Sequence, residues 1–413
     1  MGPPEVKNWG NRQEFYWKDD HIYALVERIR EHPDSRITSE VSFKTDLEDI
    51  PSHILHTQVN LLSTRGKKEL INELSERFST VDWLSAVEQL STLSLDLYRQ
   101  GQPVEEIWPE AEIPEPEFLV EPILYKDKPT LLFGEGSSGK SYLALTLALF
   151  TQLPYTDNPL NLKPQRANPL FLDYESDSYE MKRRLSTLIK GFELPETPIL
   201  YRQCTLPLAD DIDNIEKIVD ENKIGFMIID SLGIASANGN LNDAATATSF
   251  YAALRRLRTT TLILTHVAKD EAKRPSPFGS VYFTNLSRSV FLVQREQQEG
   301  GKILNLALFH KKNNQGPLLP PRGFRITFED DRTIIRKEDV TNVPEFLEKL
   351  SLRARIIALL KEGRAPTKEI AENLERDEAT IRAVLNRHKD IFVKVEDGWG
   401  LKYEKHNEGD EGA

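Results

Sequence analysis

Residues 134–141 read GEGSSGKS and lie between the apolar runs PTLLF (129–133) and YLALTLALF (142–150). The pattern G-x-x-x-x-G-K-S between a strand and a helix is typical of a phosphate-binding loop. In such a loop, backbone N–H groups surround a polyphosphate, assisted by the positive end of the following helix. Glycine is favoured because a side chain would block the approach of the phosphates. The pattern predicts that ATP is bound by Gly134, Glu135, Gly136, Ser137, Ser138, Gly139, Lys140 and Ser141.

Two side chains of this loop have predicted roles. Lys140 is expected to reach the β- and γ-phosphates, and the hydroxyl of Ser141 is expected to hold Mg²⁺. An accidental glycine-rich turn would lack the preceding strand and the following helix, and the apolar runs indicate both.

The composition argues against a membrane span or a secretion signal. The chain has 413 residues, which predicts about two or three domains. No apolar run is long enough to cross a membrane, and the N-terminus lacks an apolar segment. The single cysteine, Cys204, cannot form an internal disulfide and fits the reducing cytoplasm, where we expect the protein to be. The net charge of −12 means that any contact with nucleic acid depends on a local basic patch.

The first 101 residues predict a small α+β domain. Segments 21–31 and 35–45 are rich in β-branched and aromatic residues and are separated by HPDS, which predicts a hairpin. A third strand is expected at 54–63, followed by amphipathic helices at 66–78 and 82–101. We expect an interaction or oligomerisation domain with a replication protein as its partner.

The next two segments predict a linker and an α/β domain. Residues 102–122 are rich in proline and glutamate, which indicates a stiff acidic linker. From 123 to 335 strands alternate with helices, which predicts a mainly parallel sheet with helices on both faces, in a domain that covers residues 123–345. The last two expected strands, joined by QQEGG, would form an antiparallel hairpin at the edge of the sheet. The expected strands are 129–134, 167–174, 198–204, 224–230, 260–266, 289–296 and 303–312, and the expected helices are 140–151, 177–190, 211–222, 243–257 and 281–288.

Residues 351–405 predict a separate winged helix-turn-helix. Three helical segments, SLRARIIALLKEG, APTKEIAENL and ERDEATIRAVLNRHKD, are followed by a hairpin that turns at an Asp-Gly pair. Thr380, Arg382 and Arg387 in the third helix are candidate DNA contacts, although winged helices also bind proteins. The acidic residues 406–413 are expected to be disordered.

Three polar residues follow apolar strands of the α/β domain. Glu175 follows PLFLDY and would accept a proton from the water that attacks the γ-phosphate. The alternative is that DYESDS only caps the next helix, and Asp173 is the second candidate for the base. Asp230 ends IGFMIID and would hold Mg²⁺. His266 ends TLILTH and would sense the γ-phosphate, with a structural histidine at a strand end as the alternative.

Together these motifs resemble the RecA-like hexameric ATPases, specifically the helicases of the plasmid RepA type. The resemblance covers about residues 120–335 and rests on GEGSSGKS, FLDYESD, MIIDSLG, LTHVAKD, FGSVYFTNLSRSV and FHKKNNQG in that order. It implies a RecA-like fold and a hexamer with ATP at the subunit interfaces and DNA held by central loops. By position, it implies that Glu175 is the general base, Asp230 the Walker B carboxylate and His266 the sensor.

The sequence departs from this pattern where related ATPases often carry Lys-x-Arg, which reaches into the neighbouring site. The stretch here reads Lys312-Asn313-Asn314, so that Lys312 would supply the charge. Arg288 is the alternative arginine finger, unless it forms a structural ion pair. The loop after His266 is basic and would contact DNA phosphates in a channel or remain solvated. Its candidate contacts are Lys269, Lys273 and Arg274.

The leading interpretation is an ATP-hydrolysing DNA helicase of the RepA type from a plasmid, phage or other mobile element, which acts as a hexameric ring on single-stranded DNA. The alternative is an ATP-switched DNA-binding or loader protein that does not translocate. The missing arginine and the weakly basic C-terminal domain favour this alternative. A small-molecule kinase is the weakest interpretation, because no arginine-rich lid segment follows the core.

Overall fold

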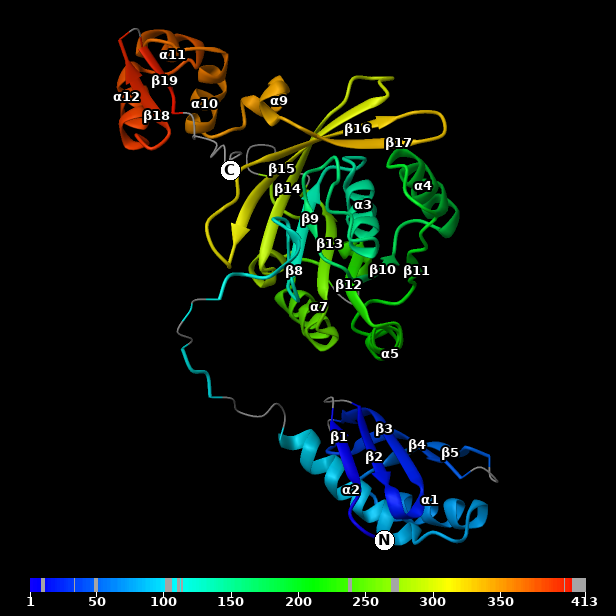
Figure 1. Ribbon diagram of the computed structural model, residues 1–413. Coiled ribbons are helices and arrows are strands. Elements are labelled where there is room, and N and C mark those ends of the chain that lie inside the picture. The colour runs from blue at the N-terminus through cyan, green and yellow to red at the C-terminus, as the bar shows by residue number, and fades with distance from the viewer. Residues whose placement is uncertain are drawn as a thin grey trace, which may run out of the picture. The chain divides into compact units, whose positions relative to one another are not determined.

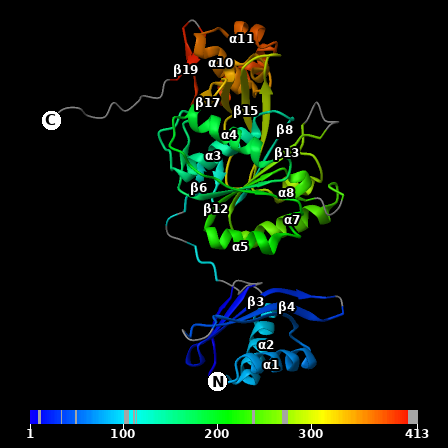
Figure 2. The same cartoon turned by 90° about the vertical axis from the view of Figure 1, so that its right-hand side faces the viewer.

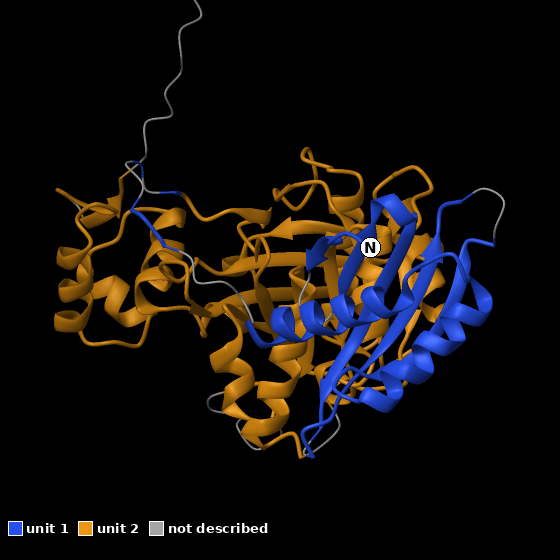
Figure 3. Cartoon of the chain, turned by 90° about the horizontal axis from the view of Figure 1, so that it is seen from below, with its two compact units in different colours: residues 1–114 blue, residues 115–413 orange. Residues whose placement is uncertain are grey.

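The computed structural model describes residues 1–8, 12–32, 34–47, 51–100, 106–109, 112, 114–236, 240–268, 275–396 and 398–402. The chain forms two compact units, residues 1–114 and residues 115–413 (Figure 3). Among the described helices, none is long and apolar enough to cross a membrane.

The described residues of the first unit form a five-stranded antiparallel sheet with two helices packed on one face. Alternate strand residues are buried because only one face carries the core, where Phe15 and Phe43 pack with Trp83. The hairpin, third strand and helices lie where the sequence predicts them, whereas the first two strands were not expected. The elements are β1 (Glu5–Asn8), β2 (Gln13–Trp17), β3 (Ile22–Glu31), β4 (Ile37–Thr45), β5 (His53–Asn60), α1 (Thr64–Arg77) and α2 (Trp83–Gln100).

The described part of the second unit is built on a nine-stranded sheet. In spatial order its strands are β11 (Leu200–Gln203), β10 (Asn168–Asp173), β12 (Ile224–Asp230), β13 (Thr260–His266), β8 (Pro129–Gly134), β14 (Ser289–Glu296), β15 (Ile303–Asn313), β16 (Arg322–Phe328) and β17 (Thr333–Glu338). The strands from β11 to β14 are parallel, which confirms the predicted α/β class, and the last three are antiparallel. The placement of β14 and β15 at the sheet edge is wrong, because β16 and β17 continue the sheet and bury Phe324 and Ile335.

Helices cover both faces of this sheet (Figures 1 and 2). On one face, α3 (Lys140–Gln152) and α4 (Ser178–Gly191) enclose a core that contains Leu145 and Phe171. On the other, α5 (Ile212–Asn222) and α7 (Ala244–Leu257) enclose a core that contains Phe250 and Met227. The central strands are continuously apolar because their side chains enter both cores. The remaining helices here are α6 (Leu232–Ala235), α8 (Val281–Leu286) and α9 (Pro344–Leu347).

Part of the expected linker belongs to the second unit. Residues 118–121 form β6 (Phe118–Glu121), which pairs with β7 (Leu124–Tyr125) and β9 (Lys163–Pro164) in a small separate sheet. The chain therefore becomes regular before position 122, because Leu119 and Val120 are buried against the α3 face.

The C-terminal elements of the second unit follow the predicted order of three helices and a hairpin. They enclose their own small core, which contains Ile356, Ile381 and Phe392. Asp397 of the predicted turn and the predicted disordered tail lie outside the described residues. The elements are α10 (Leu352–Glu362), α11 (Thr367–Asn373), α12 (Glu378–Arg387), β18 (Phe392–Val395) and β19 (Gly398–Leu401).

The parallel strands place the predicted site residues at one edge of the sheet. Asp173 pairs in register with Asp230, and His266 pairs with Gly134. We call this the carboxyl edge, because β8, β10, β12 and β13 end there. The opposite, amino edge is where β8, β13 and β14 begin.

Candidate nucleotide site

The loop between β8 and α3 has the backbone that its glycines permit. Gly139 lies at φ 79°, where a side chain is strained, and a Cβ there would approach Ile326 Cδ1 to 3.0 Å. A Cβ on Gly134 would lie 2.6 Å from the carbonyl oxygen of Val293. Gly136 differs, because a Cβ at this position would meet nothing within 4 Å beyond its chain neighbours. Its free side is where the phosphates are expected.

Lys140 lies inside this loop at the start of α3. Its Nζ donates to the carbonyl oxygens of Gly134 (3.0 Å) and Glu135 (2.7 Å) and to Ser138 Oγ (3.2 Å). Burial lowers the pKa of Lys140 to about 8, although the charges of Asp230 and Glu175 oppose this shift. The amine is thus held among the phosphate-facing atoms of the loop.

Ser141 and Asp230 form the candidate metal site. Ser141 Oγ donates to Asp230 Oδ2 at 2.6 Å, so the hydroxyl that follows the lysine meets the carboxylate that ends β12. Burial raises the pKa of Asp230 to about 6, and the nearby Glu175 and Asp173 charges add to the shift. The described residues contain no cluster of three or more His, Cys, Asp or Glu side chains that could hold a metal. Ser141 and Asp230 would be enough to hold Mg²⁺, which commonly takes one or two protein ligands and completes its shell with phosphates and water.

Glu175 faces the same space from the turn after β10. Ser231 Oγ donates a hydrogen bond to Glu175 Oε1, and His266 Nε2 lies 3.4 Å from the same oxygen. The hydrogen bond with His266, supported by Ser231 and by the charge of Lys140, holds the pKa of Glu175 below its usual range. The carboxylate is therefore ionised and can accept a proton.

Asp173, the second candidate for the base, has a different position. Its carboxylate accepts hydrogen bonds from the backbone N–H groups of Glu175 (3.0 Å) and Ser176 (2.9 Å) and from the Tyr201 hydroxyl (3.1 Å). Its side chain is 2% exposed. Asp173 thus fixes the turn that presents Glu175, and the helix-capping role considered for this stretch falls to Asp177, which caps α4.

These residues line one pocket of about 330 Å³ at the carboxyl edge. The structure brings together the loop from Ser137 to Ser141, Glu175, Asp230 and His266. It adds residues that the sequence analysis missed: Tyr142, Arg184, Gln297 and Phe328.

The added side chains form an aromatic wall beside the loop. The Tyr142 ring meets Phe328 edge-on at 5.3 Å, and the Arg184 guanidinium lies 5.7 Å from the Tyr142 ring centre. Tyr142 directly follows Ser141, and this position next to the loop is the feature of the sequence that could have placed its ring in the pocket. Phe328 ends β16, a strand that was not expected, so its approach to the loop was not predictable.

The two candidates for a cation in trans lie at the amino edge. Lys312 Nζ donates to the carbonyl oxygens of Thr284 (3.0 Å), Asn285 (2.7 Å) and Ser287 (2.7 Å), so it caps the C-terminal end of α8. Burial and the charge of Arg288 lower the pKa of Lys312. Arg288 is exposed and lines a second pocket, and no ion pair involving it occurs among the described residues.

The predicted DNA contacts divide into two groups. Lys269, Lys273 and Arg274 lie outside the described residues. In α12, the Thr380 hydroxyl donates to Asp377 at 2.7 Å, and Arg382 pairs with Glu378 at 2.7 Å. Arg387 is exposed in the last turn.

Comparison with known proteins supports an ATPase domain. Residues 98–272 match the model of a protein family described as "AAA domain", which supports a P-loop ATPase. No curated protein matches the chain. Among solved structures, a KaiC-like protein from the hyperthermophilic archaeon Pyrococcus horikoshii OT3 is similar, with 13% sequence identity and a TM-score of 0.38 over 54% of this chain and 95% of that chain.

Proposed function

We propose that this protein is an ATP-driven motor of the RepA type that acts on single-stranded DNA. The observation that carries the proposal is the position of Glu175, an ionised carboxylate in the same pocket as the phosphate-binding lysine and the Ser141–Asp230 pair. A site for binding alone needs the loop and the lysine, whereas hydrolysis also needs a group that accepts a proton from water.

Each residue of the pocket has a separate role in the proposed hydrolysis of ATP. Lys140 and the backbone of the loop bind the β- and γ-phosphates, and Ser141 and Asp230 would hold Mg²⁺, which supplies positive charge to the phosphates when bound. Glu175 Oε2, the oxygen free of the Ser231 bond, takes the proton from the attacking water. His266 contacts Glu175. It would sense the γ-phosphate and transmit its presence or loss to the loop that follows β13.

The aromatic wall is proposed to hold the nucleobase. Tyr142, Phe328 and Arg184 offer flat apolar and cationic surfaces next to the phosphate-binding loop. A base has a π-face that stacks on such side chains with a contribution of about 1–3 kcal/mol.

The proposed assembly is a homo-hexamer with DNA in a central channel, as the resemblance to RepA-type helicases implies. Arg288, at the amino edge, would complete the nucleotide site of a neighbouring copy. The first unit would bind a replication protein, the C-terminal helices and hairpin would act as a winged helix on DNA, and a plasmid or phage would be the genetic context.

ATP hydrolysis with and without single-stranded DNA tests this proposal. We expect hydrolysis that DNA stimulates and ATP-dependent unwinding of a 5′-labelled fork, with Lys140→Ala inactive in both assays. Hydrolysis that is insensitive to DNA, combined with an intact fork, would contradict the motor.

A second candidate function is an ATP-switched DNA-binding or loader protein without translocation. The observation in its favour is that the three donors of Lys312 are already used within the subunit, in addition to the missing Lys-x-Arg arginine. Light scattering in the presence of ATP separates the two: a hexamer supports the motor, whereas monomers or dimers support the switch.

A further inference from the structure

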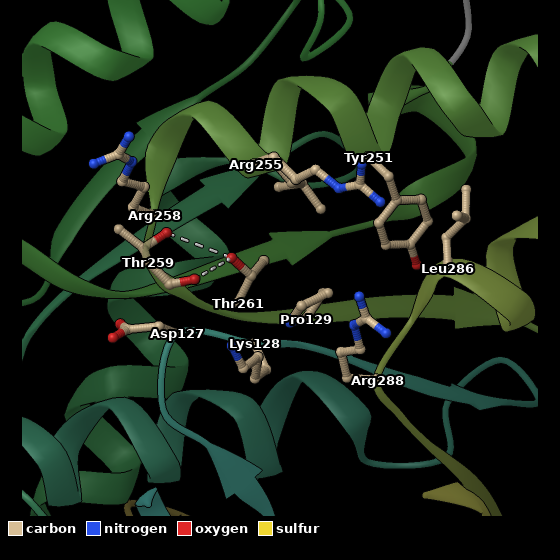
Figure 4. A pocket seen from close by; sticks show the side chains of 11 residues that line it. Asp127, Lys128, Pro129, Tyr251, Arg255, Arg258, Thr259, Thr261, Leu286 and Arg288 are labelled. Atoms are coloured by element: carbon tan, nitrogen blue, oxygen red, sulfur yellow. Dashed lines mark hydrogen bonds between the residues drawn. The ribbon is translucent and has the colours of Figure 1, made fainter. Parts of the chain in front are cut away.

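A second pocket lies at the amino edge of the sheet, between α7 and the starts of β8, β13 and β14 (Figure 4). It measures about 390 Å³. Because the nucleotide pocket lies where β8 and β13 end, the two pockets are at opposite edges of the same sheet. The amino-edge pocket is therefore separate from the nucleotide pocket of the same subunit.

The amino-edge pocket is strongly cationic. Lys128, Arg255, Arg258 and Arg288 line it, all four are exposed, and none has an ion-pair partner among the described residues. One carboxylate, Asp127, is among the lining residues. Figure 4 shows the guanidinium groups of Arg255 and Arg288 extending into the same space from opposite sides. Four cations and one carboxylate leave the pocket with an excess of positive charge, which favours a bound anion.

The adjacent residue of α7, Arg256, differs from Arg255 because it is paired. Arg256 pairs with Asp213 at 2.8 Å and also with Glu216, both on α5. The helix thus directs one arginine towards acidic partners and the next towards the pocket.

The pocket also offers hydroxyl and apolar surfaces. Thr259 and Thr261 also line it: their hydroxyl oxygens lie 3.5 Å apart, and the Thr261 hydroxyl donates to the carbonyl oxygen of Thr259 at 3.3 Å. Pro129 and Leu286 are half-buried at its sides. A bare anion would use only the cations, whereas a nucleotide unit would also use the apolar sides for its sugar or base.

We propose that the amino-edge pocket binds the phosphodiester backbone of single-stranded nucleic acid. Arg255, Arg258 and Lys128 contact phosphates, and the sugar or base rests against Pro129 and Leu286. This inference rests on the proposed function, because it assigns a second contact to the same nucleic acid. A local cationic pocket is also how a chain of net charge −12 can bind a polyanion.

Binding of a fluorescein-labelled oligo(dT) to the full chain, followed by anisotropy over a range of salt concentrations, tests the proposal. The Arg255→Ala/Arg258→Ala variant should bind about tenfold more weakly, with a slope of log K against log salt that is smaller by about 1.4, for two lost phosphate contacts. The matched control is Arg166→Ala/Lys217→Ala, which removes the same charge from two exposed residues outside the pocket. It should stay close to the wild type.

Further readouts separate the ways in which this proposal can fail. Unchanged ATP affinity shows that the variant is folded, and lysine at both positions should restore most of the binding. Equal weakening in the control, or no weakening in Arg255→Ala/Arg258→Ala, would overturn the proposal. If the variant instead loses DNA-free hydrolysis and regains it when mixed with Glu175→Gln, the pocket serves a neighbour's nucleotide and the proposal is wrong.

The proposed function is judged by a different result. If DNA stimulates hydrolysis in the wild type and the pocket variant binds DNA as well as the wild type, the motor is supported and only the proposed role of the pocket is wrong. Salt-sensitive binding through the pocket without stimulated hydrolysis would contradict the motor and support the pocket as a nucleic-acid site.

Discussion

Ser231 and His266 hold one oxygen of Glu175 from two directions, which leaves the other free for water. Removing either side chain should displace the carboxylate. We expect Ser231→Ala and His266→Ala each to lower kcat by roughly tenfold with little change in ATP affinity, because a base slightly out of place is a poorer base.

The same contacts give this prediction a pH signature. The hydrogen bond with His266 stabilises the ionised form of Glu175 and keeps its pKa low. Loss of the histidine therefore raises the pKa of Glu175, and the acid limb of the kcat profile moves to higher pH. Steady-state rates between pH 4.5 and 8 measure this shift, and a limb that moves to lower pH would contradict the assigned contact.

The two glycines on either side of Ser137 and Ser138 should respond differently to alanine. Gly139→Ala should destabilise the fold by about 1–3 kcal/mol, because φ is positive and the new Cβ would crowd Ile326. Gly136→Ala should leave the fold unchanged, since its Cβ would meet open space, but should weaken ATP binding. Urea denaturation and titration with a fluorescent ATP analogue measure both effects, and equal destabilisation would refute the distinction.

At the level of elements, Lys312 stabilises α8 through three backbone carbonyls. Lys312→Met should therefore cost about 1–3 kcal/mol of unfolding free energy, because three backbone carbonyls lose their charged donor. Lys311→Met is the control, since the adjacent Lys311 is exposed. Arg288→Ala should behave oppositely, with a lower kcat and an unchanged denaturation midpoint. A stable Lys312→Met with reduced kcat would show that Lys312 acts in catalysis.

The β14–β15 hairpin contains a histidine that should make stability depend on pH. His310 accepts a hydrogen bond from the Leu319 N–H at Nδ1 (3.0 Å), lies 2.9 Å from Ser289 Oγ through Nε2 and stacks on Phe291. Burial lowers the pKa of His310 to about 4 from its usual 6.5. The contribution of the neutral imidazole to stability is fully present above pH 6.5 and is lost as the pH falls from 6.5 towards 4, because the unfolded chain binds the proton first.

The loss for His310 should reach at most about 3 kcal/mol, from a shift of about two and a half pKa units. Urea denaturation of the wild type and of His310→Gln at pH 7.5, 6 and 5 measures it. The wild type should lose more stability than the variant over this range, and parallel losses would contradict the assignment.

Some elements were predictable and others were not, for physical reasons. The bounds of β8, β12, β13 and β14 agree with the sequence-based expectations, because continuous apolar runs between turn residues mark strands buried on both faces. β1 is fully exposed, and β16 and β17 mix charged with apolar residues. None of these three strands therefore has a strong periodic pattern of apolar residues. The missed β16 is also why Phe328 was missed.

At the scale of the whole molecule, the sequence predicted which residues meet at the carboxyl edge, but it did not predict where the cationic residues gather. Motif order predicted which strand ends meet, and the register of β10, β12, β13 and β8 brings Asp230, Glu175 and His266 together as expected. The amino-edge pocket was not predictable, because its cations come from segments separated by more than a hundred residues, from Lys128 to Arg288. Only the folded sheet brings them together.

The central claim is that Glu175 activates water for ATP hydrolysis, and Glu175→Gln tests it most directly. The measurement is the hydrolysis rate at saturating MgATP, with ATP affinity followed in parallel. We expect a rate about 10²–10⁴-fold below that of the wild type, with ATP bound as tightly as before. Hydrolysis by Glu175→Gln at the wild-type rate would show that Glu175 does not activate the water.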